Sequence, residues 1–276
     1  MSTISAALQR LHITSPQPQM LADFYATVYA MPMEKSGDTW RCRAHQRMVE
    51  VSAGPANRLR YALFRLETAQ AWKRLRERLA QAPGAALPAE WGLAPDALAA
   101  IDPDGNVIAF EGPGRIDAQH DAAPAPAQLQ HFALRTQQIE AMVAFYENVL
   151  GFVVSDKVVN EQGELRACFL RVNHLHHALA LFAAPSAGYD HQSFETPDWD
   201  GLKRWADRMG ELRQTIVWGV GRHGPGNDAF FMVRDPDGNL AEISAEIESC
   251  AEDRPAGRWP HEERTLNLWG KAIMRS

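Results

Sequence analysis

The chain has 276 residues, a length that suggests about two domains. Hydrophobic residues make up 46% and charged residues 22%, so the chain can build a core and is not of the disordered class. The 28 basic and 34 acidic residues give a net charge of −6 without a basic stripe, which argues against nucleic acid and anionic membrane surfaces as partners.

Membrane spans and cysteine chemistry are also disfavoured. No apolar run approaches the roughly 18–20 residues that cross a bilayer, and the N-terminal residues do not read as a signal peptide. The cysteines are Cys42, Cys168 and Cys250, an odd number without a CxxC pair, which argues against a disulfide framework or a cysteine-based zinc site. The sequence therefore predicts a cytoplasmic protein.

The pattern of elements places a domain boundary near the middle of the chain. Helices are expected near Gln17–Tyr29 and Ala69–Gln81, with strands around them. The segment Asp117–Ala127 is rich in Ala, Pro, Gln and Asp, which is typical of an exposed linker. We therefore predict an N-terminal domain at residues 1–117, a linker at 118–127, a catalytic domain at 128–248 and a tail at 249–276. Apolar residues in the tail, such as Trp259 and Trp269, indicate that it packs onto the body or onto a second subunit.

The second half shows clear period-2 and helical segments. Helical spacing over Gln137–Val149 is followed by Gly151, a typical helix end, and Asp198 is a candidate cap for a helix running to Met209. The predicted strands are Gln130–Arg135, Phe152–Val159, Leu165–Val172, His177–Phe182, Asp190–Glu195, Thr215–Val220, Ala229–Val233 and Leu240–Ile247. This order is two consecutive βαβββ units.

Three sequence matches between the halves indicate an internal duplication. DPDGN occurs at Asp102–Asn106 and again at Asp235–Asn239, and Phe24-Tyr25 recurs as Phe145-Tyr146. A third match, Trp72–Leu75 with Leu202–Trp205, falls in the same order. The sequence therefore predicts an α+β protein built of four βαβββ modules in two pairs.

A candidate metal triad occurs in the second half alone. His131 and His191 lie on the first strands of the two units, and Glu242 lies on the last strand. Two imidazoles and one carboxylate leave open coordination positions, a set that suits Fe(II), with Mn(II) as the alternative. The repeat aligns these residues with Arg10, Tyr61 and Ala109, so the first half has the scaffold without the ligands. The competing interpretation is that the two halves differ at these positions because surface residues diverge without a change in function.

A family resemblance rests on several separated motifs. They are LQHFALRTQQIEAMVAFYENVLGFVVSDK, NHLHHALALF, YDHQSFE, GVGRHGPGN and FMVRDPDGNLAEI. Together they resemble the type I extradiol ring-cleaving dioxygenases of the vicinal oxygen chelate superfamily. The resemblance covers most of the chain and implies paired βαβββ modules, Fe(II) held by His131, His191 and Glu242, and cleavage of a catechol beside its hydroxyls. It also implies a homo-oligomer.

Further site residues follow from the resemblance. By motif, His177 matches the family's acid/base histidine. An imidazole suits this role because it can take a proton from a hydroxyl and return it. Because a strand alternates faces, His176 and His177 cannot both point at the metal, and His174 and His176 are not expected to contact it. The competing interpretation is that the whole cluster of His174, His176 and His177 is a polar rim. His223, in a Gly-rich loop, matches a hydrogen-bond donor near the substrate. The remaining candidates for the pocket are Asn227, Asp228 and Trp218, whereas Trp40, Trp91, Trp199 and Trp205 are interpreted as core.

Met232 departs from the family pattern. The family usually has a tyrosine ten residues before the glutamate ligand, and this chain has Met232 there. A tyrosine hydroxyl can donate a hydrogen bond to a substrate oxygen, whereas a thioether accepts weakly. Either another donor has taken over, or the substrate and reaction differ, or Met232 is core packing.

The leading hypothesis from the sequence is an Fe(II)-dependent extradiol-type dioxygenase acting on an aromatic diol with O2. The second is another metal-dependent reaction on the same fold, such as isomerisation, epoxide opening or an unusual oxidation. The third is a metal-free small-molecule binding protein.

Overall fold

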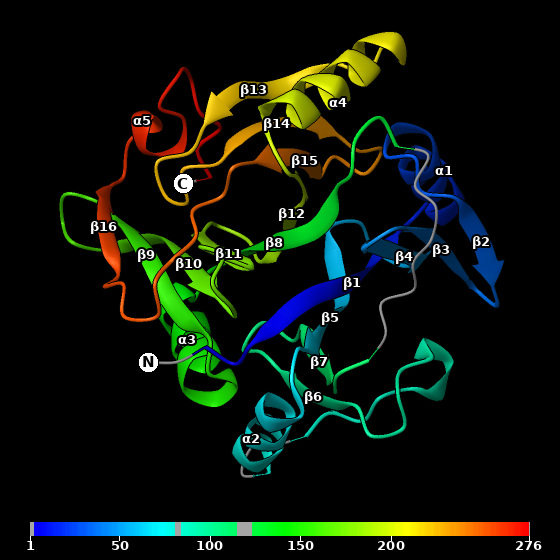
Figure 1. Cartoon of the computed structure of the whole chain (residues 1–276), viewed down its shortest axis with the longest axis vertical. Coiled ribbons are helices and arrows are strands. Elements are labelled where there is room, and N and C mark those ends of the chain that lie inside the picture. The colour runs from blue at the N-terminus through cyan, green and yellow to red at the C-terminus, as the bar shows by residue number, and fades with distance from the viewer. Residues whose placement is uncertain (1–2, 81–83, 115–122, 276) are drawn as a thin grey trace.

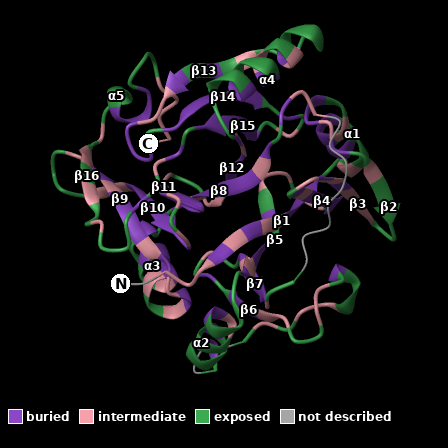
Figure 2. Cartoon of the chain, viewed as in Figure 1, coloured by how far each residue is buried: buried purple, intermediate pink, exposed green. Residues whose placement is uncertain are grey.

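The computed structural model describes residues 3–80, 84–114 and 123–275, which form two curved sheets (Figure 1). The first sheet has the order β2-β3-β4-β1-β5-β7-β6, and the second has the order β13-β14-β15-β12-β8-β11-β10-β9-β16. Strands line the interior, and the long helices lie at the periphery with their outer faces exposed (Figures 1 and 2). The predicted α+β class is confirmed.

The elements of the first half follow the predicted order. They are β1 (Ala6–Ser15), α1 (Pro18–Val28), β2 (Met33–Ser36), β3 (Thr39–Ala44), β4 (Arg47–Ala53), β5 (Arg58–Leu66), α2 (Ala69–Leu79), β6 (Leu98–Ile101) and β7 (Val107–Glu111). The first module is a complete βαβββ unit. The second has two strands after its helix in the described residues, because Gly84–Ala97 runs as loop with one 3₁₀ turn, Ala89–Trp91. This corrects the expectation of four complete modules.

The second half contains two complete modules. Its elements are β8 (Gln128–Thr136), α3 (Ile139–Ala144), β9 (Val153–Val159), β10 (Leu165–Arg171), β11 (Leu179–Ala183), β12 (Gly188–Thr196), α4 (Trp199–Glu211), β13 (Ile216–Arg222), β14 (Ala229–Arg234) and β15 (Leu240–Ala245). The two modules meet where β8 pairs antiparallel with β12. Each first strand also pairs in parallel with the last strand of its own module.

Local signals explain the helix bounds. The Asp198 side chain accepts a hydrogen bond from Gly201 N at 2.8 Å, the predicted cap of α4. The predicted helix after residue 137 begins at Ile139 and widens to a π-helix over Phe145–Leu150. Gly151 ends it at φ +81°, a conformation that favours glycine.

One core joins the two halves. Tyr29 and Phe194 lie 5.0 Å apart between ring centroids, and Phe64 and Phe132 lie 6.3 Å apart, so aromatic side chains of both sheets meet. Alternation along β8 places Phe132 in this core and its neighbour His131 on the opposite face. The core therefore packs against one face of the second sheet, and the side chains on the other face are available to form a site.

The segments outside the modules pack closely. The first residues of the predicted linker lie outside the described residues; of the rest, Ala125 and Ala127 are buried, whereas Pro126 between them is exposed. The tail forms β16 (Gly257–Pro260), parallel to β9, and α5 (Glu263–Leu266), so it packs onto the body. Trp199 is 43% exposed and is not core. In the described residues, every helix is too short or too polar to span a membrane.

Glu195, near the end of β12, gives the fold a pH dependence. Burial raises the pKa of Glu195 to about 7 from an ordinary value of 4.5. Its stabilising contribution is fully present below about pH 4.5 and is lost as the pH rises to about 7, because the buried carboxyl then ionises. Glu195→Gln keeps an acceptor for Ile247 N and is expected to stabilise the metal-free protein by about 1–2 kcal/mol at pH 8.

The measurement is thermal unfolding of the metal-free variant at pH 5 and at pH 8. The gain is expected to be several times larger at pH 8 than at pH 5. Exposed Glu161→Gln is the matched control, with no expected change at either pH. An equal gain at both values of pH would contradict the assigned titration.

Candidate metal centre

Strand register brings the three predicted ligands to one face of the second sheet. β15, β12 and β8 are neighbours, and Ser193 on β12 pairs with His131 on one side and with Glu242 on the other. Directly paired residues share a face, and so do residues two apart on a strand, which adds His191. Strands far apart in the sequence therefore deliver all three side chains to one point.

An unpaired residue precedes each candidate histidine ligand. The β8–β12 register skips Gln130 and Asp190, so each is a bulge residue next to His131 or His191. Bulges re-aim side chains, and here each places a hydrogen-bonding group beside the following imidazole. The same register irregularities recur in the first half at Gln9 and Arg60, the residues before Arg10 and Tyr61. The duplication thus includes the distortions that shape the site.

The hydrogen bonds fix the tautomers of both imidazoles. His131 Nδ1 donates to Gln130 Oε1, and His191 Nδ1 donates to Asp190 Oδ1 at 2.7 Å. Both Nε2 lone pairs are therefore free and face the same point. Although burial opposes it, the charge of Arg275 and the hydrogen bond from His191 hold the pKa of Asp190 well below its usual range, so Asp190 is a carboxylate.

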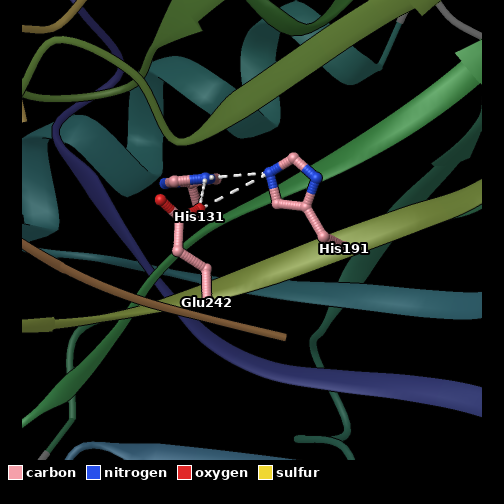
Figure 3. A group of neighbouring side chains, drawn as sticks. All are labelled: His131, His191 and Glu242. Atoms are coloured by element: carbon pink, nitrogen blue, oxygen red, sulfur yellow. Dashed lines mark hydrogen bonds and ion pairs between the residues drawn. The ribbon is translucent and has the colours of Figure 1, made fainter. Parts of the chain in front are cut away.

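The three ligand atoms have the spacing of a metal site. The two Nε2 atoms lie 3.3 Å apart, and Glu242 Oε2 lies 3.3 Å from His131 Nε2 and 3.7 Å from His191 Nε2 (Figure 3). Ligands at about 2.1 Å from one ion are separated by similar distances. Both Glu242 oxygens are buried without a hydrogen-bond partner, which a carboxylate tolerates when a cation neutralises it. The residues present therefore fit a divalent metal with open positions.

A hydrogen bond to His176, which itself lies in ion-pair contact with Asp156, holds His177 beside the triad. Its ring centroid lies 4.3 Å from that of His131, and its Nδ1 lies 3.0 Å from Nδ1 of buried His176. His176 Nε2 lies 3.2 Å from Asp156 Oδ2. Burial lowers the pKa of His177 well below its usual value, so the free imidazole is neutral and can accept a proton. His176 is thus a buried partner of His177, and His174 is exposed, so the cluster as a whole is not a polar rim.

Asp156 and the two bulge residues were not predicted as parts of the site. Gln130 and Asp190 had a detectable signal, because a side chain able to hold Nδ1 precedes each histidine ligand. Asp156 had none, because β9 meets His176 only through tertiary packing.

His223 and two neighbours line the cavity in front of the triad. His223 Nδ1 donates to the Leu266 carbonyl at 2.6 Å, and its ring stacks on Phe230 at 3.7 Å between centroids. Its Nε2 therefore points toward Glu242, with 3.5 Å to Oε1. Met232 pairs with Glu242 in register, and Trp218 lies beside His223. The cavity is lined by His131, Phe169, His177, Ala180, Phe182, His191, Trp218, His223, Pro225, Met232, Leu266 and Arg275.

Asp228 and Asn227 take different positions. Asp228 is fully buried, both its oxygens lack a hydrogen-bond partner, and it can share a cation-sized space with His223 and Glu242. Burial raises the pKa of Asp228. Asn227 is exposed in a turn at φ +54° and does not reach the cavity. The structure therefore brings Asp228 to the edge of the site and leaves Asn227 outside.

The equivalent space in the first half is filled by side chains. The registers of β1–β5 and β5–β7 align Arg10, Tyr61 and Ala109 with the triad, as the repeat predicted. Arg10 Nη1 donates to Tyr61 Oη at 3.1 Å and to the Trp91 carbonyl at 3.1 Å. Trp91 stacks on Tyr61 at 4.6 Å. Trp91, from the loop Gly84–Ala97, thus fills this space together with Arg10 and Tyr61.

Comparison with known proteins identifies the superfamily of the second half of the chain. The sequence profile of the Glyoxalase/Bleomycin resistance protein/Dioxygenase superfamily matches residues 128–243. Metapyrocatechase 2 of Cupriavidus necator is 29% identical over 199 residues, which cover 63% of this chain and 60% of that protein. Biphenyl-2,3-diol 1,2-dioxygenase 3 of Rhodococcus globerulus is 31% identical over 159 residues, which cover 53% of this chain and 77% of that protein.

Solved structures agree with the fold. The Mn(II)-bound glyoxalase from Novosphingobium aromaticivorans has a TM-score of 0.82 at 22% identity, over 100% of this chain and 93% of that one. A variant of homoprotocatechuate 2,3-dioxygenase from B. fuscum also gives 0.82, at 20% identity, over 99% of this chain and 80% of that one. The match to the Rhodococcus relative, with the superfamily profile, shows that this chain belongs to the extradiol dioxygenases of the glyoxalase/bleomycin resistance protein/dioxygenase superfamily.

Proposed function

We propose that this chain is an Fe(II)-dependent extradiol-type dioxygenase that cleaves an aromatic vicinal diol with O2. The observation that carries the proposal is the convergence of two Nε2 lone pairs and an unpartnered Glu242 carboxylate beside a buried, neutral His177. A bound Fe(II) would supply open positions for the diol and O2 and a route for electrons between them. Relatives named 3-methylcatechol 2,3-dioxygenase and biphenyl-2,3-diol 1,2-dioxygenase 3 support the substrate class.

The chain's own groups have distinct roles in this proposal. His177 takes a proton from the substrate hydroxyl at its free Nε2 and returns it as the ring opens. His223, held by the Leu266 carbonyl, orients oxygen atoms at the substrate through Nε2. The walls formed by Phe169, Phe182 and Trp218 suit an aromatic ring and exclude water.

A second candidate function is another metal-dependent reaction at the same triad, such as isomerisation, epoxide opening or an atypical oxygenation. Met232 favours it, because this side chain, next to Glu242 on the neighbouring strand, offers no hydroxyl donor. A manganese-bound glyoxalase of the same fold makes Mn(II) the alternative metal. The chain spans 60% of one metapyrocatechase and 38% of another, so the reaction of the whole protein is part of this proposal.

The test is anaerobic loading with Fe(II), metal quantitation, and oxygen uptake with one-ring and two-ring catechols. We expect about one iron per chain and oxygen consumption that yields a ring-opened product. Metal binding with turnover that needs no oxygen, or that prefers Mn(II), would favour the second candidate. Tight binding of small aromatic molecules by a protein that takes up no metal would leave only a binding function. A cytoplasmic location and homo-oligomeric assembly stay predictions from sequence and resemblance.

A matched pair of substitutions tests the consequence of Met232. Met232→Tyr places a donor in the wall, and Met232→Phe gives nearly the same bulk without one. We expect kcat/KM for catechol to be roughly 10–100-fold higher in the tyrosine variant than in the phenylalanine variant, because one well-placed donor has about this effect. Equal values would mean that another group already supplies the hydrogen bond.

A further inference from the structure

Arg275, near the end of the tail, enters the candidate site. Its Nη2 donates to Asp190 Oδ1 at 2.7 Å and its Nε to Asp190 Oδ2 at 3.3 Å. Its guanidinium lies over the rings of Phe182 at 4.8 Å and Trp218 at 5.0 Å. The side chain is 6% exposed, so this is a buried, two-pronged ion pair at the cavity wall.

The carboxylate that Arg275 holds is the one that orients a metal ligand. Asp190 Oδ1 accepts from both Arg275 Nη2 and His191 Nδ1, each at 2.7 Å. Arg275, Asp190 and His191 thus form a continuous chain that ends at a free Nε2 lone pair. Arg135 Nε, 3.5 Å from Oδ2, is a second and longer contact.

We propose that Arg275 is a positioning residue that holds Asp190 against His191, so that the metal site is complete only when the tail is docked. The inference rests on the proposed metal triad. A buried carboxylate that loses a charged partner is costly, and without the two-pronged contact from Arg275 it can rotate away from its histidine. Groups that orient metal-bound histidines typically contribute about 10–100-fold in metal affinity.

Other contacts of the tail agree with this coupling. Trp218 Nε1 donates to the Lys271 carbonyl at 3.0 Å, four residues before Arg275. The Leu266 carbonyl holds His223, and Trp259 Nε1 donates to Asp156 Oδ2 at 2.6 Å. Tail residues therefore contact His223 itself and the carboxylates that lie beside His176 and His191. Of these contacts, the one made by Arg275 is a buried ion pair next to a proposed metal ligand.

The experiment measures Fe(II) affinity under nitrogen by competition with a chromogenic chelator, which needs no substrate and no turnover. Arg275→Gln is expected to weaken Fe(II) binding about 10–100-fold. Arg275→Lys should recover part of the affinity, because it restores the charge without the planar fork. Lys271→Gln, in the same tail and exposed, is the matched control and should bind like the unchanged protein.

A double variant tests the route of the effect. If Arg275 acts through Asp190, the pair Arg275→Gln and Asp190→Asn should bind Fe(II) no more weakly than Asp190→Asn alone. Unchanged affinity in folded Arg275→Gln, or fully additive losses, would overturn the inference. If Arg275→Gln does not fold, the test is made with Arg275→Lys. An Fe(II) affinity of this variant equal to that of the unchanged protein, together with no coupling to Asp190→Asn, would overturn the inference. Failure of the unchanged protein to bind Fe(II) would instead refute the proposed function.

Discussion

His131→Ala is expected to abolish stoichiometric Fe(II) binding and to reduce oxygen-dependent ring cleavage to background. The substitution removes one of three ligands and leaves Glu242 and His191 facing an incomplete site. The loss should exceed the roughly 10–100-fold expected for a supporting residue, because a coordinate bond is removed directly. Iron content after anaerobic loading and oxygen uptake with a catechol measure the two effects.

His174→Ala is the matched control for this prediction. It removes an exposed histidine from the loop between β10 and β11, so iron content and activity should match those of the unchanged protein. A His131→Ala protein with full iron content and full activity would show that the triad is not the metal site. The same loss in both variants would indicate a general effect on folding.

His177→Asn is expected to lower kcat by about 10²–10⁴-fold while iron content stays near that of the unchanged protein. The side chain lies against the triad and is held by His176, but its free nitrogen is assigned to the substrate proton and not to the metal. Steady-state kinetics on iron-loaded protein and metal quantitation together measure this separation. Loss of iron in parallel with kcat would reassign His177 to a structural or ligand role.

A milder change in the supporting chain gives a graded comparison. Asp156→Asn leaves His177 in place and weakens the contact at His176, while it also changes the contacts of residue 156 with the tail. Its effect on kcat should be smaller than that of His177→Asn and should leave iron binding intact. An effect as large as that of His177→Asn would indicate that Asp156 supports the fold of the tail, because Trp259 and Arg254 also contact it.

Much of the site could be predicted because its signals are periodic and local. Duplication aligned His131 with Arg10 and His191 with Tyr61, and strand register in both halves gives the same alignment. Helix caps were predicted for the same reason, since Asp198 and Gly151 act within a few residues of themselves. Family resemblance supplied His177 and His223, which the residues alone would have left as ordinary histidines.

The rest depends on long-range packing that no local pattern encodes. Arg275 meets Asp190 across 85 residues, and the group that holds His223 is a backbone carbonyl, which any residue could supply. The contact between His176 and His177 was not predicted, because alternation puts neighbouring side chains on opposite faces, whereas the chain is irregular here and β11 begins only at Leu179. In the described residues of the first half, a loop that carries Trp91 occurs where a further strand was predicted. Trp91 packs on Tyr61, and no local pattern indicates this tertiary contact.

The proposal that O2 is inserted into an aromatic diol is tested most directly by isotope labelling. The iron-loaded protein is given a catechol under ¹⁸O2, and the ring-opened product is analysed by mass spectrometry. The proposed function predicts that both atoms of one O2 molecule enter the product. A product without label, formed equally well under nitrogen, would contradict it and move the same triad to a reaction in which oxygen takes no part.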